Sequence, residues 1–139
     1  MIRKFNVDDI TSNEVVLPEL RLFSAIIFQA FHDGCEVRTP GILSHRRQQL
    51  GNQLQQLRHM NESVRAGDQI PPSRKKNLKT QIARTRKKIE CLEARGWFDP
   101  ANQWCIYLLH QLDIDPAWFF QAVDQAFQRY DKLGYSFIA

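Results

Sequence analysis

The first strongly apolar stretch of the chain lies between Pro18 and Gly34. Because proline suits the first turn of a helix and glycine the position just past its end, these two residues predict a helix over 18–34. The apolar positions within it occupy nearly every side of the helix, and they include Leu20, Phe23, Ile27 and Phe31. A helix that is apolar all round is normally surrounded by others, so we expect 18–34 to be the central helix of a small body.

Two apolar stripes with a period close to seven residues occupy the middle of the chain. The first stripe consists of Leu43, Leu50, Leu54, Leu57 and Val64, and the second of Leu78, Ile82, Thr85, Ile89 and Leu92. Between the stripes, Pro71 and Pro72 block helix continuation, and Ser73 is placed to cap the helix that follows. Matching stripes on either side of a turn predict an antiparallel coiled-coil hairpin over 43–95.

Two shorter helices are predicted after the hairpin. Asp99-Pro100 and Asp115-Pro116 each place a capping carboxylate directly before a proline that can occupy the first helical position. The second of these helices has one clean apolar face, formed by Trp118, Phe119, Ala122, Val123, Ala126, Phe127 and Tyr130. We therefore expect a two-helix unit over 100–133.

Together these elements predict an all-α fold. One domain over 1–139 would consist of a small three-helix body with an inserted antiparallel coiled-coil helical hairpin. Residues 1–17 show no sustained period, but four apolar residues in them could pack as an arm against the body or a neighbouring molecule: Ile2, Phe5, Val7 and Ile10. A homodimer formed through this arm or through the apolar face of 118–130 is a further expectation.

Charge is distributed unevenly along the chain. Its 139 residues have a hydrophobic fraction of 43% and a charged fraction of 24%, which are the values of a globular protein. The segment from Ser44 to Arg95 contains 13 lysines and arginines but four acidic residues, whereas the remainder contains six against 11. Such a concentration of positive charge predicts an anionic partner for the hairpin, nucleic acid being the usual one.

The second hairpin helix carries the densest group of cations. The candidate nucleic-acid-binding residues are Arg74, Lys75, Lys76, Lys79, Arg84, Arg86, Lys87 and Lys88. Three of them fall in the first helical turn, where the helix macrodipole is already positive, so an anion bound near the tip would relieve the repulsion. The alternative is that the cations only solvate a long helix, since they lie on several of its sides and lysine and arginine are good helix formers.

The segment 108–119 resembles the helix-turn-helix pattern of many transcription regulators, with Leu112 and Ile114 turned inward. Its charge does not favour DNA binding, because 99–131 contains five acidic residues and one cation, Arg129. Three glutamines of the second helix could hydrogen-bond base edges, but phosphate repulsion would oppose their approach. We therefore interpret the pattern as helix packing.

Three runs in the same region resemble a pattern found in small helical proteins of bacteriophages and prophages. They are Ala94-Arg95-Gly96-Trp97-Phe98, Trp104-Cys105-Ile106 and Leu112-Asp113-Ile114-Asp115-Pro116. This chain departs from the pattern at Asp113, where those proteins often have glycine, and the basic hairpin stands as an insertion. The resemblance implies an origin in a phage or another mobile element and a regulatory or host-directed activity, and it supplies no biochemical role.

The sequence offers few candidates for catalysis or metal binding. His32, Cys35 and Glu36 could form a nucleophile pair or part of a metal site, but a helix end of the form His-Asp-Gly is common for structural reasons. The chain contains no glycine-rich phosphate loop, no His-Glu-x-x-His helix and no nucleophile elbow. We therefore expect a protein that is not an enzyme and that has no catalytic residue, cofactor or metal.

Cysteine spacing and hydropathy favour a cytoplasmic location. Cys35, Cys91 and Cys105 are widely spaced and odd in number, so they form neither a disulfide framework nor a zinc motif. The apolar region 20–31 is shorter than the ~20 residues that a membrane span needs. The first residues of the chain do not resemble a secretory signal.

Five aromatic residues near the C-terminal helices raise the question of base stacking: Trp97, Phe98, Trp104, Trp118 and Phe119. Their helical spacing favours positions in the core. Because Trp97 and Phe98 lie outside the periodic runs, we expect these two to be the most exposed of the five.

The function that these features favour is nucleic-acid binding of a regulatory kind, by a small phage-like protein whose basic hairpin contacts the phosphates of DNA or RNA. The alternative is a protein-interaction module or inhibitor that binds a host enzyme or a transcription component through the acidic body or the hairpin. No membrane partner is expected.

Overall fold

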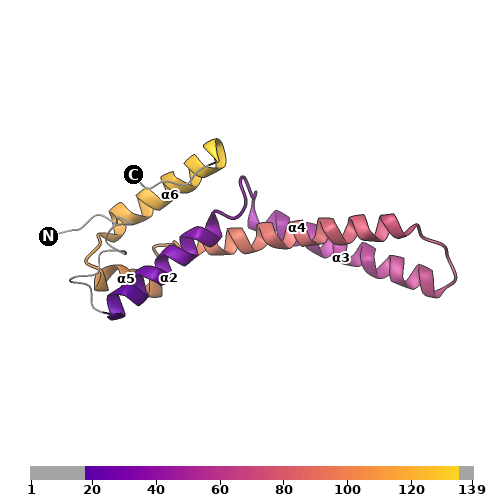
Figure 1. Cartoon of the computed structure of the whole chain (residues 1–139), viewed down its shortest axis with the longest axis horizontal. Coiled ribbons are helices and arrows are strands. Elements are labelled where there is room, and N and C mark those ends of the chain that lie inside the picture. The colour runs from indigo at the N-terminus through magenta and orange to yellow at the C-terminus, as the bar shows by residue number, and fades with distance from the viewer. Residues whose placement is uncertain (1–17, 135–139) are drawn as a thin grey trace. The chain divides into compact units, whose positions relative to one another are not determined.

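The computed structural model describes residues 18–134, so the predicted arm over 1–17 lies outside the described residues. These residues form helices and no strand, which confirms the all-α prediction. The helices are α2 (Pro18–Gly34), α3 (Leu43–Arg65), α4 (Pro72–Gly96), α5 (Gln103–Gln111) and α6 (Pro116–Leu133), shown in Figure 1. None of these helices is both long enough and apolar enough to cross a membrane.

The chain divides into two compact units. The first, which we call the body, comprises residues up to Thr39 and from Glu93 onward. The second, which we call the basic unit, is Pro40–Leu92 and contains α3 and most of α4. The two units differ in which residues they bury.

One apolar core organises the body. Helices α2, α5 and α6 contribute to it together with the turn between α5 and α6, through Ile27, Cys105, Leu108, Leu109, Ile114, Phe119, Val123 and Phe127. Aromatic rings close this core at one end, where Phe31 stacks on Phe127 at 5.1 Å between centroids and Phe98 meets both rings edge-on. The apolar face predicted for α6 is therefore buried within its own chain.

The expectation that 18–34 is surrounded by other helices is wrong. Its bounds are those of α2, but α2 buries only Ser24, Ile27 and Gly34. On its other sides apolar residues face solvent, with Leu22 60% exposed. Packing partners lie on one side of α2 in the described structure, and the remaining apolar residues form part of the protein surface.

Helix starts follow the predicted chemistry at α6 but not at α5. The Asp115 carboxylate accepts a hydrogen bond from Trp118 N at 3.3 Å, and Pro116 occupies the first turn, as predicted. Asp99 does not cap α5. The cap is Asn102, whose Oδ1 accepts from Trp104 N at 3.1 Å, so that helix begins three residues later than the Asp-Pro pair indicates. Similarly, α4 begins at Pro72, and Ser73 lies inside its first turn.

A charged cluster fastens the C-terminal end of α6 to the rest of the body. Arg95 and Asp131 form a bidentate pair with two N–O distances of 2.7 Å, and both side chains are largely buried. Arg95 Nε also donates to Gly34 O at 2.7 Å, and its guanidinium lies over the Phe127 ring at 4.9 Å. The pair thus joins the end of α2, the end of α4 and α6.

The same carboxylate and its neighbours hold the segment after α2. Thr39 N donates to Asp131 Oδ1 at 2.8 Å, and Arg38 Nη2 donates to the backbone oxygens of Asp131 and Lys132 near the end of α6. Arg38 thereby supplies a partner for carbonyls in the last turn of the helix, where cations are favourable. The hydrogen bonds from Arg95, followed by the one from Thr39, hold the pKa of the Asp131 carboxyl below its ordinary value.

In the basic unit, α4 buries one row of residues, namely Leu78, Ile82, Thr85 and Ile89. These are four of the five residues of the predicted second stripe. The fifth, Leu92, is half-buried, and Cys91, which lies outside the stripe, is buried as well. The first stripe on α3 is less buried: Leu50, Leu54 and Leu57 are half-buried, and Val64 is exposed. The buried residue of α3 is Gln53, whose Oε1 accepts no hydrogen bond from the residues between 18 and 134. The antiparallel coiled-coil packing of α3 and α4 stays a prediction.

Candidate nucleic-acid interface

The eight candidate cations follow α4 from its first turn to its last third. Six of them are exposed: Arg74, Lys76, Lys79, Arg84, Arg86 and Lys87. Lys75 and Lys88 are half-buried beside the buried row of the helix. The charged heads therefore surround the solvent side of α4 instead of forming a single narrow stripe.

Positive charge in the basic unit is not balanced within that unit. Pro40–Leu92 contains 12 lysines and arginines and three acidic residues, which are Glu62, Asp68 and Glu90. Within this unit none of the eight candidate side chains forms an ion pair or hydrogen bond with these acids. Glu62 lies instead 3.8 Å from His59 on its own helix. The arrangement leaves the cations of α4 available to an anionic ligand.

Some of the cations counted with the hairpin in the sequence have structural contacts, and Arg95 and Arg46 are examples. Arg95 belongs to the body and is paired with Asp131, so it is not part of an anion-binding surface. Arg46 is folded back onto Pro40 O at 2.7 Å and onto Gln49 Oε1 at 3.0 Å. Conversely, Arg58 and Arg65 of α3 are exposed and add to the positive surface. Both are among the cations of the basic segment in the sequence, but they lie outside the dense group on α4.

A groove of about 550 Å³ opens in the basic unit near the loop that joins its helices. Residues of α3, of the loop and of α4 line it: Gln56, His59, Met60, Ser63, Ile70, Arg74, Asn77, Leu78 and Gln81. The loop-proximal parts of α3 and α4 therefore lie on either side of one cavity. Of the eight candidate cations, Arg74 is the one in its wall.

The helix-turn-helix pattern folds as packing elements, as we interpreted it. Ile114 is buried and Leu112 half-buried, and both contact the body core. The exposed side of α6 offers little for phosphates, because Gln128 Nε2 donates to the Asp124 carboxylate at 2.8 Å. The described geometry of this region gives no reason to place a nucleic acid on it.

The aromatic expectation is wrong for Trp104. Trp97 and Phe98 are half-buried and pack against the core cluster. Trp104, in contrast, is 73% exposed and meets the half-exposed Tyr107 edge-on at 6.4 Å. Cys105, Leu108 and Leu109 occupy the core-facing side of α5, so its first-turn tryptophan points into solvent.

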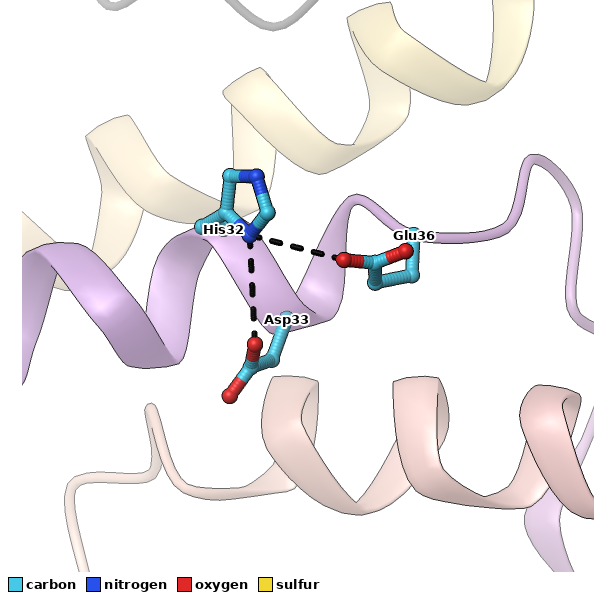
Figure 2. A group of neighbouring side chains, drawn as sticks. All are labelled: His32, Asp33 and Glu36. Carbon is cyan, nitrogen blue, oxygen red and sulfur yellow. Dashed lines mark ion pairs between the residues drawn. The ribbon is translucent and has the colours of Figure 1, made fainter.

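His32, Asp33 and Glu36 form an exposed cluster at the end of α2, shown in Figure 2. His32 Nδ1 lies 3.9 Å from Asp33 Oδ1 and 3.5 Å from Glu36 Oε1. Their ligand atoms lie within 4.8 Å of one another, and among residues 18–134 no fourth ligand joins them, as a closed zinc site requires. The cluster has the form of an ordinary charged helix end.

Two of the cysteines contribute to packing in the body. Cys35 is half-buried and packs against the core, and its backbone N donates to His32 O at 3.0 Å while the imidazole lies toward the carboxylates. Burial raises the pKa of the Cys105 thiol to about 12, which keeps it protonated.

Comparisons of the chain with protein-family models, with curated proteins and with solved structures found no match. The resemblance to small phage and prophage proteins therefore stays a prediction.

Proposed function

We propose that the protein binds nucleic acid through the cations of α4 in the basic unit. The observation that carries this proposal is the set of eight lysines and arginines that are not neutralised by acids of their own unit. A polyanion that approaches such a helix releases condensed counterions as it is neutralised, which makes binding favourable and strongly dependent on salt. The contacts are to phosphates, so they carry no preference for a base sequence.

The charge pattern supports a ligand more than it supports solvation alone. A helix that needs only solubility is well served by alternating signs, because opposite charges four residues apart stabilise it. From Pro72 to Ile89, α4 contains eight cations and no acidic residue. It also has no acid in its first turn, where one would be favourable. A bound anion would remove both costs.

Salt-dependent binding of labelled oligonucleotides tests the proposal. In one variant, Lys76, Lys79, Arg86 and Lys87 are each replaced by glutamine, which keeps good helix formers at these exposed positions. We expect about 100-fold weaker binding at low salt and a decrease of about three in the slope of log affinity against log salt. Unchanged binding, or no binding by the wild type at low salt, would remove the proposal.

A matched control separates the position of the cations from the net charge of the protein. Four exposed amides elsewhere in the basic unit are changed to acids: Gln48→Glu, Asn52→Asp, Gln55→Glu and Gln69→Glu. This variant loses the same net charge as the α4 variant, but it keeps every cation. We expect its binding to weaken several-fold less. Equal weakening would mean that binding follows net charge and not the cations of α4.

A second candidate function is protein interaction through the body. Trp104 and Tyr107 are exposed, in contact with each other, and next to Phe23, and exposed aromatic groups of this kind are frequent binding hot spots. The host-directed activity implied by the phage resemblance would use such a surface. Trp104→Ala is expected to release a stoichiometric partner captured from nuclease-treated host lysate, while the α4 variant retains it.

A further inference from the structure

The groove of the basic unit combines three kinds of lining side chain. Met60, Ile70 and Leu78 are apolar, and Leu78 is buried. Amide and hydroxyl groups come from Gln56, Ser63, Asn77 and Gln81. The remaining two residues, His59 and Arg74, supply a titratable and a charged nitrogen. Its volume of about 550 Å³ falls in the range of small-ligand sites.

Each kind of side chain matches one part of a nucleotide. Apolar side chains such as those of Met60 and Leu78 can pack against the faces of a base. Asparagine and glutamine offer a donor and an acceptor side by side, which suits the hydrogen-bonding edge of a base. The guanidinium of Arg74 suits a phosphate, for which it is a bidentate donor.

The positive charge around the groove favours an anionic ligand. The groove lies at the first turns of α4, where Arg74 and Lys75 meet the positive end of the helix dipole without an acidic neighbour in that turn. The unit around it has nine more cations than acids. A neutral apolar ligand would use only the apolar lining residues, whereas a nucleotide would use all three kinds of lining group.

We infer that this groove binds one unpaired nucleotide of a single-stranded nucleic acid that lies along α4. The inference rests on the proposed function, because the α4 cations hold the strand whose base enters the groove. Bases of a duplex are stacked and paired, so their faces and edges are not free to enter. The groove therefore gives the protein a preference for single strands that the phosphate contacts alone do not provide.

Removing neutral groove residues tests this preference without changing charge. The variant carries Asn77→Ala and Gln81→Ala, and its matched control carries Asn52→Ala and Gln55→Ala, which lie on α3 outside the groove lining. All four positions are exposed, and circular dichroism checks that each variant remains helical. Binding is measured by fluorescence anisotropy at one salt concentration, with a single strand and a duplex of the same sequence.

We expect the groove variant to bind the single strand about tenfold more weakly, and the duplex within about twofold of the wild type. The control should change neither affinity. If the wild type binds but the groove variant loses nothing, or loses both affinities equally, the groove inference is overturned and the proposed function stands. If the wild type binds neither strand nor duplex at low salt, both are overturned.

A photo-crosslinking experiment locates the base independently. A single strand with one 4-thiouridine, made as RNA and as DNA of the same sequence, is irradiated in complex with the wild-type protein. We expect crosslinked peptides to contain Met60 or His59, whereas crosslinks confined to other peptides contradict the inference. A crosslink with both strands shows that the base alone is bound, and one confined to RNA shows that the ribose hydroxyl contributes.

Discussion

The body and the basic unit use charge in opposite ways. The described part of the body contains nine acidic residues and five cations, and a largely buried bidentate pair joins Arg95 to Asp131. The basic unit has 12 cations and three acids, and the side chains of its eight α4 candidates remain unneutralised by that unit. The body thus pairs opposite charges within its own fold, whereas the basic unit carries an excess of positive charge.

The two units also differ in how completely their polar groups are satisfied. Every oxygen of the Asp131 carboxylate accepts a hydrogen bond in the body. In the basic unit, Gln53 is 8% exposed, yet no group in the described part of the chain donates a hydrogen bond to its Oε1. A buried unsatisfied carbonyl costs free energy of folding, so the body is expected to be stabilised by its buried polar groups and the basic unit to be weakened by one.

The largest expected effect is the loss of the buried pair in the body. Asp131→Asn keeps the shape of the side chain but leaves the Arg95 guanidinium without a carboxylate. We expect the free energy of unfolding at pH 7 to fall by about 3 kcal/mol, as measured by urea denaturation. The control is Asp124→Asn on the exposed side of α6, which should cost less than about 0.5 kcal/mol.

The pH dependence of stability gives the same pair a second test. Because the pKa of Asp131 is lower in the folded protein, its stabilising contribution is present above the unfolded value of about 4 and is lost as the pH falls through the folded value. The wild type should therefore lose its advantage over Asp131→Asn on acidification. A constant difference between the two proteins from pH 7 to pH 2 would contradict this assignment.

A smaller effect of opposite sign is expected in the basic unit. Gln53→Leu removes the unsatisfied carbonyl and fills the site with an apolar side chain of similar size, so we expect stabilisation by about 1–2 kcal/mol. Slower amide hydrogen exchange over residues 43–92 is the measurement. Gln55→Leu, at an exposed position of the same helix, should leave exchange unchanged. Destabilisation by Gln53→Leu would show that the amide has a partner, such as an ordered water.

If α3 and α4 pack antiparallel as predicted, Gln53 and Thr85 form one buried polar layer. In that arrangement Gln53 and Thr85 lie level with each other, since they are nearly equidistant from the loop that joins α3 and α4. Thr85 is buried as well, and its hydroxyl donates to Gln81 O at 3.0 Å. A polar layer of this kind can fix the register of a coiled coil at a cost in stability. A Gln53→Cys/Thr85→Cys disulfide would test the pairing directly.

Local patterns predicted most of the helices and the placement of charge, because both depend on neighbours in sequence. The Asp115-Pro116 cap and the buried row of α4 are examples. The role of Arg95 could not be predicted in this way. In the sequence it belongs to the basic segment Ser44 to Arg95, and its partner Asp131 is 36 residues away in another helix. Only the folded chain brings the two side chains together.

The exposed aromatic surface escaped prediction for a related reason. Helix α5 has nine residues with apolar side chains on several sides, so its periodicity does not reveal which side the core will use. The core takes the side with Cys105 and Leu109, and Trp104 is left outside. The same ambiguity affects α2, where Ile27 is buried and Leu22 is not. Candidate interaction surfaces on apolar helices thus require the tertiary structure.

The smallest effect concerns the backbone at the edge of the body. Thr39 has a φ of 45°, in the left-handed region that β-branched residues avoid, and the hydrogen bond from its N to Asp131 helps to hold it there. Thr39→Gly would relieve about 1–2 kcal/mol of strain while making the unfolded chain more flexible by about 0.5–1 kcal/mol. We therefore expect net stabilisation below about 1 kcal/mol in urea denaturation.

Asp113 provides the comparison that separates strain relief from other effects of glycine. Its φ of 55° lies in the same region, but aspartate adopts this conformation at lower cost than threonine. Asp113→Gly should consequently stabilise the protein less than Thr39→Gly does, because there is less strain to relieve and the unfolded chain gains the same freedom. If Asp113→Gly gives the larger gain, backbone strain at Thr39 is not what limits stability there. Favourable side-chain contacts, in addition to the Asp131 hydrogen bond, would then hold Thr39 in its conformation.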